Sequence, residues 1–553
     1  MGLAARQDEQ LWQQLYSEAK QVVAEEPALA QYINGCVIRH GNYGSALACV
    51  LSAQLATAHL SADVINQVFS QALRSDPAIL DAAMNDLQAH IDRDPATLGY
   101  LTAFLYFKGY HALQVHRFSH WLWTQGREAL EAQVDAALGK LELADSLQNL
   151  APCHVVVEAI VEDLQEKRKL FSALESIVSE SCILASNTSS LSVTAMAAAC
   201  RRPQRVAGYH FFNPVPVMKI VEVVDGVMTD PAATEALAGL ARRFGHSPVR
   251  CKDTPGFVVN HAGRAFVPEA LRVLSEGVAD FATIDRILVD AAGFRIGPFG
   301  LMDLVGLDVA HAVMKSMYDQ YFEEPKYKPS FLAEPRVAAG LLGRKTGRGW
   351  YVYGKDGAQP IPEVQAPTVE RPRAVWSEVA DFATTQSKDA ELCIVAPLGK
   401  DATTAALELG LDPARTVAVD PMFSSKRLTL MTTPVTRPEV RDAAHAALAA
   451  TGRKVSVIND SPGFVAQRVV AHIVNVGCDI AQMRIAAPQD LDRAVTLGLG
   501  YPKGPLAMGD ALGAGRILAI LDAMHAIYQD PRYRASPWLR RRANLGISLL
   551  TSE

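Results

Sequence analysis

The sequence predicts a multidomain protein of mixed α and α/β class. Three observations carry this prediction. The first part of the chain, up to about residue 130, shows only helical periodicity, and the next part, up to residue 253, alternates short apolar runs with a helical pattern. The helical sequence that follows occurs twice. With 553 residues, the chain has room for roughly three to five domains.

The composition is that of a globular protein with no polyanion-binding surface. Hydrophobic residues make up 49% of the chain and charged residues 20%, and the net charge is −6 with a pI near 6.2. This balance argues against nucleic acid as a partner. No apolar run is long enough to span a bilayer and the N-terminus lacks a signal-peptide core, so we expect no membrane partner and a cytoplasmic location. The eight cysteines form no C-x-x-C pair, which predicts reduced thiols and no metal site.

Residues 1–128 are expected to form an all-α domain. Leu11, Leu15 and Ala19 recur at helical spacing. Asp76 precedes Pro77 as an N-cap precedes a first helical position, and Arg93-Asp94-Pro95 repeats this arrangement. No alternating β pattern interrupts the helical sequence.

Residues 131–253 are expected to form an α/β domain. Between residues 163 and 177 the spacing predicts a helix. Short apolar runs of the kind that form buried parallel strands lie at 155–157, 182–185, 206–209 and 220–224.

The rest of the chain contains an internal repeat. Helical sequence at 254–353 is followed by a proline-rich linker (354–376), a small α/β segment (377–460) and a second helical region (461–553). The matching blocks stand 207 residues apart: Thr254-Pro255-Gly256-Phe257-Val258 with Ser461-Pro462-Gly463-Phe464-Val465, Ile284-Asp285-Arg286 with Leu491-Asp492-Arg493, Gly297-Pro298 with Gly504-Pro505, and Asp303 with Asp510.

Four polar residues of this α/β and helical region suit removal of a proton from an alcohol. His210 follows a strand, where open α/β sheets place their active sites, and a neutral imidazole is a suitable base. Glu222 on the next strand could orient that imidazole, while Ser189 and Asn260 could bind the substrate oxygen. Each has an alternative explanation: His210 as a structural hydrogen-bond partner, and Ser189 and Asn260 as helix caps. Only the first repeat keeps the whole set, since Gln467 replaces Asn260 in the second.

Residues from about 131 onward resemble the L-3-hydroxyacyl-CoA dehydrogenases, in the longer bacterial form with a duplicated C-terminal domain. The motifs that carry the resemblance are Val-Val-Glu-Ala-Ile (156–160), Asn-Thr-Ser-Ser (187–190), His-Phe-Phe-Asn-Pro-Val-Pro-Val-Met-Lys (210–219), Thr-Pro-Gly-Phe-Val-Val-Asn (254–260) and Gly-Arg-Lys-Thr-Gly-Arg-Gly (343–349).

This resemblance implies a Rossmann-like domain followed by two helical domains of the 6-phosphogluconate dehydrogenase C-terminal type. It implies NAD as cofactor, an acyl-CoA substrate and a homo-oligomer. His210 would be the base, Glu222 its partner, and Ser189 and Asn260 substrate contacts. The residues implied as contacts near the cofactor are Glu162, Lys167, Ser189, Asn213 and Lys345.

Two departures from that family are visible in the sequence. His261 stands where the family usually has arginine. The larger departure is the missing G-x-G-x-x-G turn, because none of the triplets Gly347–Gly349, Gly498–Gly500 and Gly513–Gly515 completes the pattern. Since this turn holds the pyrophosphate at a helix N-terminus, we expect a truncated Rossmann-like domain, an exposed sheet edge and weak NAD binding.

Residues 1–128 resemble the N-terminal helical domain of serine acetyltransferase. The matching segments are Asn42–Leu47, Arg93-Asp94-Pro95, Tyr106–Gln114 and His120–Trp123. The resemblance implies serine binding by Asp94, but the hexapeptide repeats that complete that enzyme are missing, so an N-cap role for Asp94 is favoured.

The sequence therefore favours NAD-dependent oxidation of a 3-hydroxyacyl-CoA, with activity impaired by the missing loop. Two alternatives stay open at this point. One is a protein related to serine O-acetyltransferase. The other is a non-catalytic fusion of fragments from two families.

Overall fold

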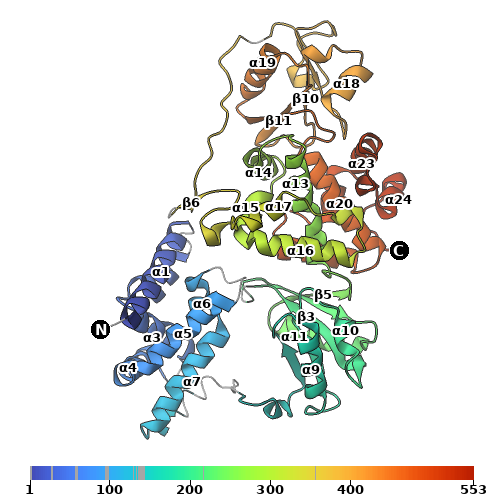
Figure 1. Ribbon diagram of the computed structural model, residues 1–553. Coiled ribbons are helices and arrows are strands. Elements are labelled where there is room, and N and C mark those ends of the chain that lie inside the picture. Colours follow the sequence, from blue (N-terminus) through green and yellow to red (C-terminus); the bar gives the residue numbers. More distant parts are fainter. Residues whose placement is uncertain are drawn as a thin grey trace. The chain divides into compact units, whose positions relative to one another are not determined.

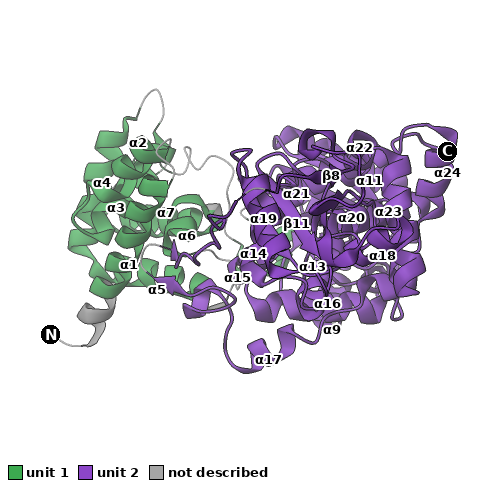
Figure 2. Ribbon diagram, turned by 90° about the horizontal axis from the view of Figure 1, so that it is seen from above, with its two compact units in different colours: residues 1–151, 213–217 green, residues 152–212, 218–553 purple. Residues whose placement is uncertain are grey.

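The computed structural model describes residues 3–25, 29–56, 60–93, 99–128, 130–131, 134, 144–213, 215, 217–354, 357–370 and 372–553. Figure 1 shows the order of the elements. The chain divides into two compact units: residues 1–151 with 213–217 form unit 1, and residues 152–212 with 218–553 form unit 2 (Figure 2).

Unit 1 is a helical assembly, as predicted. Its main helices are α1 (Leu3–Glu25), α3 (Tyr43–Leu55), α4 (Ala62–Ser75), α5 (Pro77–Arg93), α6 (Tyr100–Tyr106) and α7 (Lys108–Thr124). The Asp76 carboxylate accepts from the Ala78 amide at the start of α5, which confirms the predicted cap. The core is apolar and includes Leu15, with Phe69 stacked on Phe118 at a centroid distance of 4.1 Å. Asp94 lies outside the described residues.

The first α/β region of unit 2 is one five-stranded sheet in the order β1-β2-β3-β4-β5. The strands are β1 (Val155–Glu158), β2 (Ile183–Ser186), β3 (Val206–Phe211), β4 (Ile220–Asp225) and β5 (Ser247–Lys252). The first four confirm the predicted strands, whereas β5 was not predicted because its sequence is polar. Neighbouring strands run parallel except β3 and β4, which are antiparallel. The helices of this region are α9 (Leu164–Glu175), α10 (Val193–Ala197) and α11 (Pro231–Arg243).

Two similar helical regions follow the two sheets. The first contains α12 (Val259–Ala262), α13 (Phe266–Ser275), α14 (Phe281–Asp290), α15 (Pro298–Val305) and α16 (Leu307–Gln320). The second contains α20 (Ala466–Gln482), α21 (Pro488–Leu499), α22 (Pro505–Leu512), α23 (Ala514–Tyr528) and α24 (Pro537–Leu545).

These two regions share their local hydrogen bonds. The Asp285 carboxylate accepts from the first amides of α15, and Asp492 does the same for α22. The internal repeat found in the sequence is therefore a repeat of structure.

The repeat extends to the second sheet, which the sequence did not reveal. Its strands follow the order β8-β9-β10-β11-β12, and the single antiparallel pair is again the one between the third and fourth strands, β10 and β11. The strands are β8 (Val375–Ser377), β9 (Leu392–Val395), β10 (Thr416–Val419), β11 (Arg427–Thr432) and β12 (Lys454–Ile458), with helices α18 (Ala402–Glu408) and α19 (Pro438–Ala449). The stretch predicted as a linker contains the short pair β6 (Tyr353–Gly354) and β7 (Gly357–Ala358) at its start and the first residues of β8 at its end.

A buried ionic cluster joins the two helical regions. The Arg468 guanidinium contacts the carboxylates of Glu269 and Glu276, and Arg532 contacts Glu269 at 2.7 Å. Burial alone would raise the pKa of Glu269, but the two guanidinium groups outweigh it and hold that pKa well below its ordinary range. Removing one partner would leave a buried charge uncompensated, so this cluster fixes how the two copies pack.

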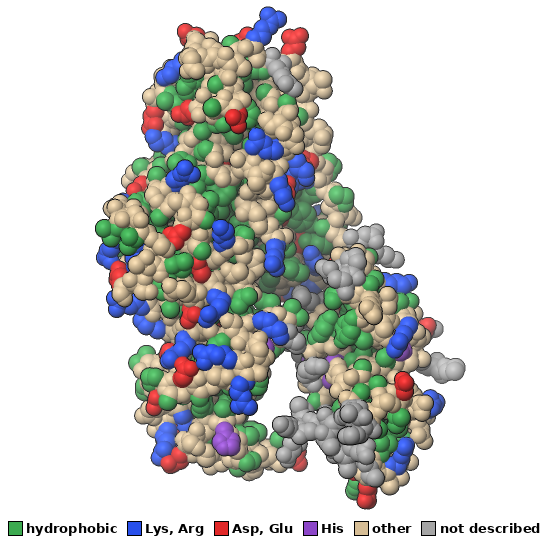
Figure 3. Space-filling view, turned by 180° about the vertical axis from the view of Figure 1, so that it is seen from behind, with side chains coloured by type: hydrophobic (Ala, Val, Ile, Leu, Met, Phe, Trp, Pro, Cys, Tyr) green, Lys and Arg blue, Asp and Glu red, His purple; other side chains and the backbone are tan. Residues whose placement is uncertain are grey.

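No single helix among the described residues is both long and apolar enough to cross a membrane; α22 and α23 reach that composition only as a pair bent by 96°. On the face shown in Figure 3, basic and acidic side chains are intermingled.

Candidate active site

The carboxyl ends of two adjacent parallel strands bring the candidate residues to one edge of the first sheet. Gly208 of β3 pairs with Ser186 of β2. His210 therefore lies two residues beyond this pairing on β3, and Ser189 lies three residues beyond it, in the loop after β2. His210 is within β3, one residue before its end, and the prediction had placed it just after the strand. The location agrees with the rule that open α/β sheets bind ligands at this edge.

His210 forms a buried pair with Glu222. The His210 Nδ1 atom lies 2.7 Å from Glu222 Oε2, and these residues face each other across the antiparallel β3–β4 pair. The His210 side chain is 8% exposed and that of Glu222 is fully buried. A carboxylate at Nδ1 keeps the hydrogen on that nitrogen, so Nε2 is the atom available as a base.

The helical region that follows the sheet fixes the other oxygen of this carboxylate. Glu222 Oε1 accepts hydrogen bonds from the amides of Val258 at 3.0 Å and Val259 at 2.9 Å. Charged hydrogen bonds of this kind are about twice as strong as neutral ones. The orientation of the imidazole thus depends on two regions of unit 2, the sheet and the start of α12.

A strained turn aims these two amides. Gly256 and Phe257 both have left-handed backbones, with φ of 70° and 49°. Phenylalanine rarely adopts this conformation, which costs on the order of 1 kcal/mol. The conformation turns consecutive amides toward one point, as in other anion-binding backbone turns. The same turn recurs at Gly463 and Phe464, where φ is 77° and 53°.

A second carboxylate organises the loop that carries Ser189. Glu162 Oε1 accepts from the hydroxyls of Thr188 and Ser190 and from the amide of Ser189 at 3.2 Å. Burial alone would raise the pKa of Glu162, but these hydroxyls and the ammonium of Lys167 outweigh it and lower that pKa. The loop is therefore held in one conformation, with the Ser189 side chain exposed at the sheet edge.

Sequence reasoning missed the role of Glu158, a residue inside one of the recognised motifs. Its carboxylate lies 2.9 Å from the buried Lys167 ammonium, whose distance to Glu162 is 3.3 Å. Ser186 donates to the same carboxylate. An acidic residue directly after an apolar strand run was the available signal. The buried Lys167 ammonium thus has its charge balanced by Glu158 and Glu162, and this arrangement suits a structural role in holding the loop.

The remaining predicted residues are not all brought together. Asn260 is half-buried in α12, directly after the amides that bind Glu222. Lys345 lies in the short helix Arg344–Thr346 and pairs with Asp308 at 2.7 Å. Asn213 is exposed and groups with unit 1. Asp94 lies outside the described residues.

His261, the residue noted in place of arginine, is neutral and fully enclosed. Its ring nitrogens lie 2.6 Å from the Tyr327 hydroxyl and 2.9 Å from the Tyr321 hydroxyl. Burial and the nearby Arg264 and Lys326 lower the pKa of His261 to about 3. In the second copy the same position is Arg468, the centre of the buried ionic cluster. His261 therefore stabilises the helical region and does not exchange protons near neutral pH.

The outer edge of β1 has no neighbouring strand among the described residues. Val157 on this strand and Ile160 and Val161 after it are exposed. The corresponding strand of the second sheet is different, because the amides of Thr384 and Thr385 both donate to the carbonyl of Val375 and cover its edge.

A Rossmann-like sheet with a histidine–carboxylate pair at its carboxyl edge, followed by a helical domain, is typical of dehydrogenases that act on alcohols. Comparison with known families agrees. Residues 116–254 match the NAD binding domain of 3-hydroxyacyl-CoA dehydrogenase, and residues 256–353 and 463–548 both match the C-terminal domain of the same family. Residues 11–115 match the N-terminal domain of serine acetyltransferase.

Individual relatives lead to the same family. The 3-hydroxyadipyl-CoA dehydrogenase of Escherichia coli K12 is 37% identical over 428 residues, which cover 76% of this chain and 87% of that protein. The human mitochondrial hydroxyacyl-coenzyme A dehydrogenase is 44% identical over 199 residues, 36% of this chain and 63% of that protein. A crystal structure of 3-hydroxybutyryl-CoA dehydrogenase from Escherichia coli K12 matches with a TM-score of 0.68 and 35% identity over 79% of this chain and 90% of that chain. The chain belongs to the 3-hydroxyacyl-CoA dehydrogenase family, with a serine acetyltransferase N-terminal domain added.

Proposed function

We propose that this chain is an NAD-dependent oxidoreductase that interconverts the 3-hydroxy and 3-oxo groups of an acyl-CoA. The observation that carries the proposal is the His210–Glu222 pair, held at 2.7 Å in a buried position and fixed by two amides of the next domain. A base for a secondary alcohol must have one nitrogen free and its tautomer fixed, and this pair meets both conditions.

The chemistry divides among residues of this chain. His210 Nε2 would take the proton from the 3-hydroxyl group, and Glu222 would stabilise the resulting imidazolium. Ser189 and Asn260 would bind the oxygen at the reacting carbon. NAD, when bound, accepts the hydride from that carbon. The proton thus leaves the hydroxyl oxygen and the hydride leaves the carbon that bears it, and only the proton is handled by the protein.

The residues fit one end of NAD better than the other. Ser189 stands exposed on a loop fixed by Glu162, at the same sheet edge as His210, where a nicotinamide ribose would be bound. Lys345 and Asn213 are further proposed contacts, although the pair of Lys345 with Asp308 would have to open. The sequence contains no glycine-rich turn for the pyrophosphate, and β1 lacks an outer neighbour among the described residues. We therefore propose that NAD binds weakly.

A steady-state assay tests the proposal. Acetoacetyl-CoA should oxidise NADH, with a KM for NADH well above that of an intact relative, and the His210→Ala variant should lose the activity. Tight NADH binding in a fluorescence titration would contradict the weak-cofactor part. Absence of acetoacetyl-CoA-dependent oxidation even at saturating NADH would contradict the whole proposal.

Two further expectations concern unit 1. We propose that it joins copies of the chain into a homo-oligomer, which light scattering after size-exclusion chromatography would show. Serine acetyltransferase activity is the second candidate function, favoured only by the match of residues 11–115. Serine-dependent consumption of acetyl-CoA would support it over the dehydrogenase.

A further inference from the structure

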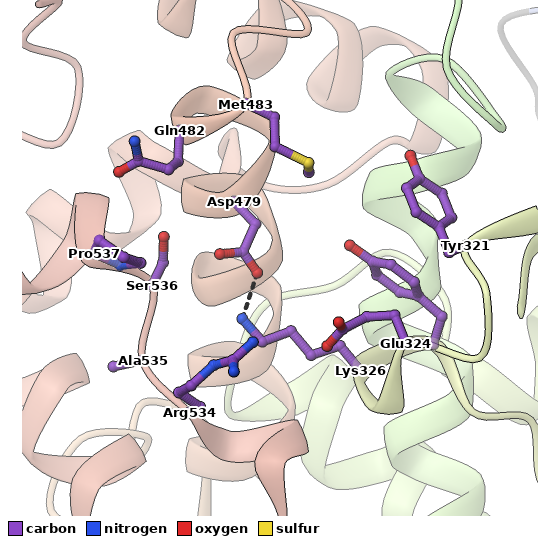
Figure 4. A pocket seen from close by; sticks show the side chains of 11 residues that line it. Tyr321, Glu324, Lys326, Asp479, Gln482, Met483, Arg534, Ala535, Ser536 and Pro537 are labelled. Carbon is purple, nitrogen blue, oxygen red and sulfur yellow. Dashed lines mark hydrogen bonds and ion pairs between the residues drawn. The ribbon is translucent and has the colours of Figure 1, made fainter.

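A cavity of about 510 Å³ lies between the two helical copies of unit 2. One side comes from the end of α16 and the turn Pro325–Tyr327, and the other from the end of α20 and the segment before α24 (Figure 4). Its volume is within the range of small-molecule sites. The cavity is separate from the edge of the sheet where His210 lies, and the proposed dehydrogenase chemistry does not use its residues.

Four charged side chains line the cavity, and two of them form an ion pair. Lys326 and Asp479 form an ion pair, the one drawn as a dashed line in Figure 4. Glu324, from the first copy, and Arg534, from the second, also line the cavity. No ion pair or side-chain hydrogen bond of either residue is found among the described part of the chain. Glu324 is half-buried and Arg534 is exposed, and no ion pair joins these two opposite charges in the described structure.

The remaining walls are apolar or aromatic. Tyr321 and Tyr327 contribute their rings, with hydroxyls already engaged by His261, and Met483 adds a thioether chain. A ligand for this cavity must therefore combine an anionic group, a cationic group that donates hydrogen bonds, and an apolar part. A free amino acid has this combination in its zwitterionic form.

We propose that this cavity binds a free amino acid with an apolar or aromatic side chain. Its carboxylate contacts Arg534, its ammonium group contacts Glu324, and its side chain packs against Tyr321 and Met483. Arginine suits the carboxylate because its planar guanidinium offers paired donors. Glu324 belongs to the first copy of the repeat and Arg534 to the second, so the site exists only where the two copies meet.

Calorimetric titration of the full-length protein with three matched compounds tests this proposal. The compounds are L-phenylalanine, 3-phenylpropanoate, which lacks the ammonium group, and 2-phenylethylamine, which lacks the carboxylate. L-phenylalanine should bind at least about tenfold more tightly than either analogue, a difference of about 1.4 kcal/mol.

Two variants assign the charges to residues. Arg534→Gln should remove the preference for L-phenylalanine over 2-phenylethylamine. Glu324→Gln should remove the preference over 3-phenylpropanoate. Arg516→Gln, an exposed change in α23 away from the cavity, should leave all three affinities unchanged.

The result that would overturn the proposal is equal affinity for the three compounds, or no binding of L-phenylalanine or L-leucine at millimolar concentration. Binding that neither Arg534→Gln nor Glu324→Gln weakens would also overturn it. Each variant's fold is checked by its thermal unfolding, so a lost signal is not mistaken for a lost site.

Discussion

The two sheets of unit 2 have one strand order and two different chemical contents. In the first, His210 on β3 faces Glu222 on β4. In the second, the amide of Asp420, just after β10, donates to the carbonyl of Thr429 on β11, at the matching place. The His210–Glu222 pair of the first sheet thus corresponds in position to Asp420 and Thr429 in the second sheet. Duplication kept the frame and changed the residues that would do the chemistry.

The hydrogen bonds around the two sheets include some that both copies share. Asp253 accepts from the Val193 and Thr194 amides at the start of α10, and Asp460 accepts from the Ala402 amide at the start of α18. Both copies also keep the left-handed phenylalanine turn. These features position helices, so they persist without an active site. In the second copy Gln467 donates to Asp420 and accepts from the Gly399 amide, so the matching place holds hydrogen bonds between helix and strand ends and not a base with its carboxylate.

The largest expected difference between the copies is catalytic. His210→Ala should lower kcat/KM on the order of 10³-fold, because general base catalysis contributes that much. Asp420→Asn, its counterpart, should leave kcat/KM unchanged. The measurement is NADH oxidation by acetoacetyl-CoA, with circular dichroism as the control for folding. An equal loss in both variants would show that the second sheet takes part in catalysis.

The facing residues should differ in stability as well as activity. Glu222→Gln removes the charge that two amides and His210 share, so the free energy of unfolding should fall by about 1–3 kcal/mol and kcat by about 10²-fold or more. Thr429→Val removes a buried hydroxyl that has no partner among the described residues. This change should be neutral or stabilising, within about 1 kcal/mol. Denaturant unfolding measures the free energy of unfolding of both variants. A clear loss of stability in Thr429→Val would contradict the expected difference.

The second copy should also respond to pH through Asp420. Burial raises the pKa of Asp420 to about 6, against its hydrogen bonds from Gln467 and two amides, so the folded protein keeps a proton that the unfolded chain loses near pH 4. Its contribution to stability is therefore full below about pH 4 and is lost as the pH rises to about 6.

Asp420→Asn removes this dependence. Relative to the parent protein, the variant should gain up to about 3 kcal/mol between about pH 4 and pH 7, since each pKa unit corresponds to about 1.4 kcal/mol. Urea unfolding at several pH values measures the difference. Parallel stability curves for the two proteins would contradict the raised pKa.

The smallest effect concerns the repeated turn. Gly256→Ala and Gly463→Ala should each destabilise the protein by about 1–2 kcal/mol, because an added Cβ at positive φ is strained. At Gly256 that Cβ would also lie 2.6 Å from Met317 Sδ. Only Gly256→Ala should lower kcat as well, since its turn aims the amides that bind Glu222. Equal activity of both variants would show that the turn does not position the pair.

Much of this arrangement could be predicted from sequence, and the limits have physical causes. Apolar runs such as Val155–Val157 revealed strands, and motif order placed His210 and Glu222 together. The β5 sequence Ser-Pro-Val-Arg-Cys-Lys has no such run, so its pairing with β4 was not visible. The correspondence between the two sheets could not be predicted from the sequence, because the offset between matching residues is not constant. Gly208 corresponds to Ala418, 210 residues later, and Val224 corresponds to Met431, 207 residues later.

The site was predicted less completely than the fold. Glu158 and the amides of Val258 and Val259 act through contacts between elements distant in sequence, which no local pattern reports. The roles of Ser189, Asn260, Asn213, Lys345 and Asp94 stay predictions, as do the domain limits and the homo-oligomer. They depend on bound molecules or on partners.

The transfer of deuterium tests the central claim most directly, because it needs only one turnover and tolerates weak cofactor binding. The protein is mixed with acetoacetyl-CoA and excess NADH in which both C4 hydrogens are deuterium, and the product is analysed by mass spectrometry. The account predicts 3-hydroxybutyryl-CoA that is heavier by one deuterium at C3, formed about 10³-fold more slowly by His210→Ala and at the parent rate by Asp420→Asn. Unlabelled product, or no product from the parent protein at saturating NADH, would contradict it.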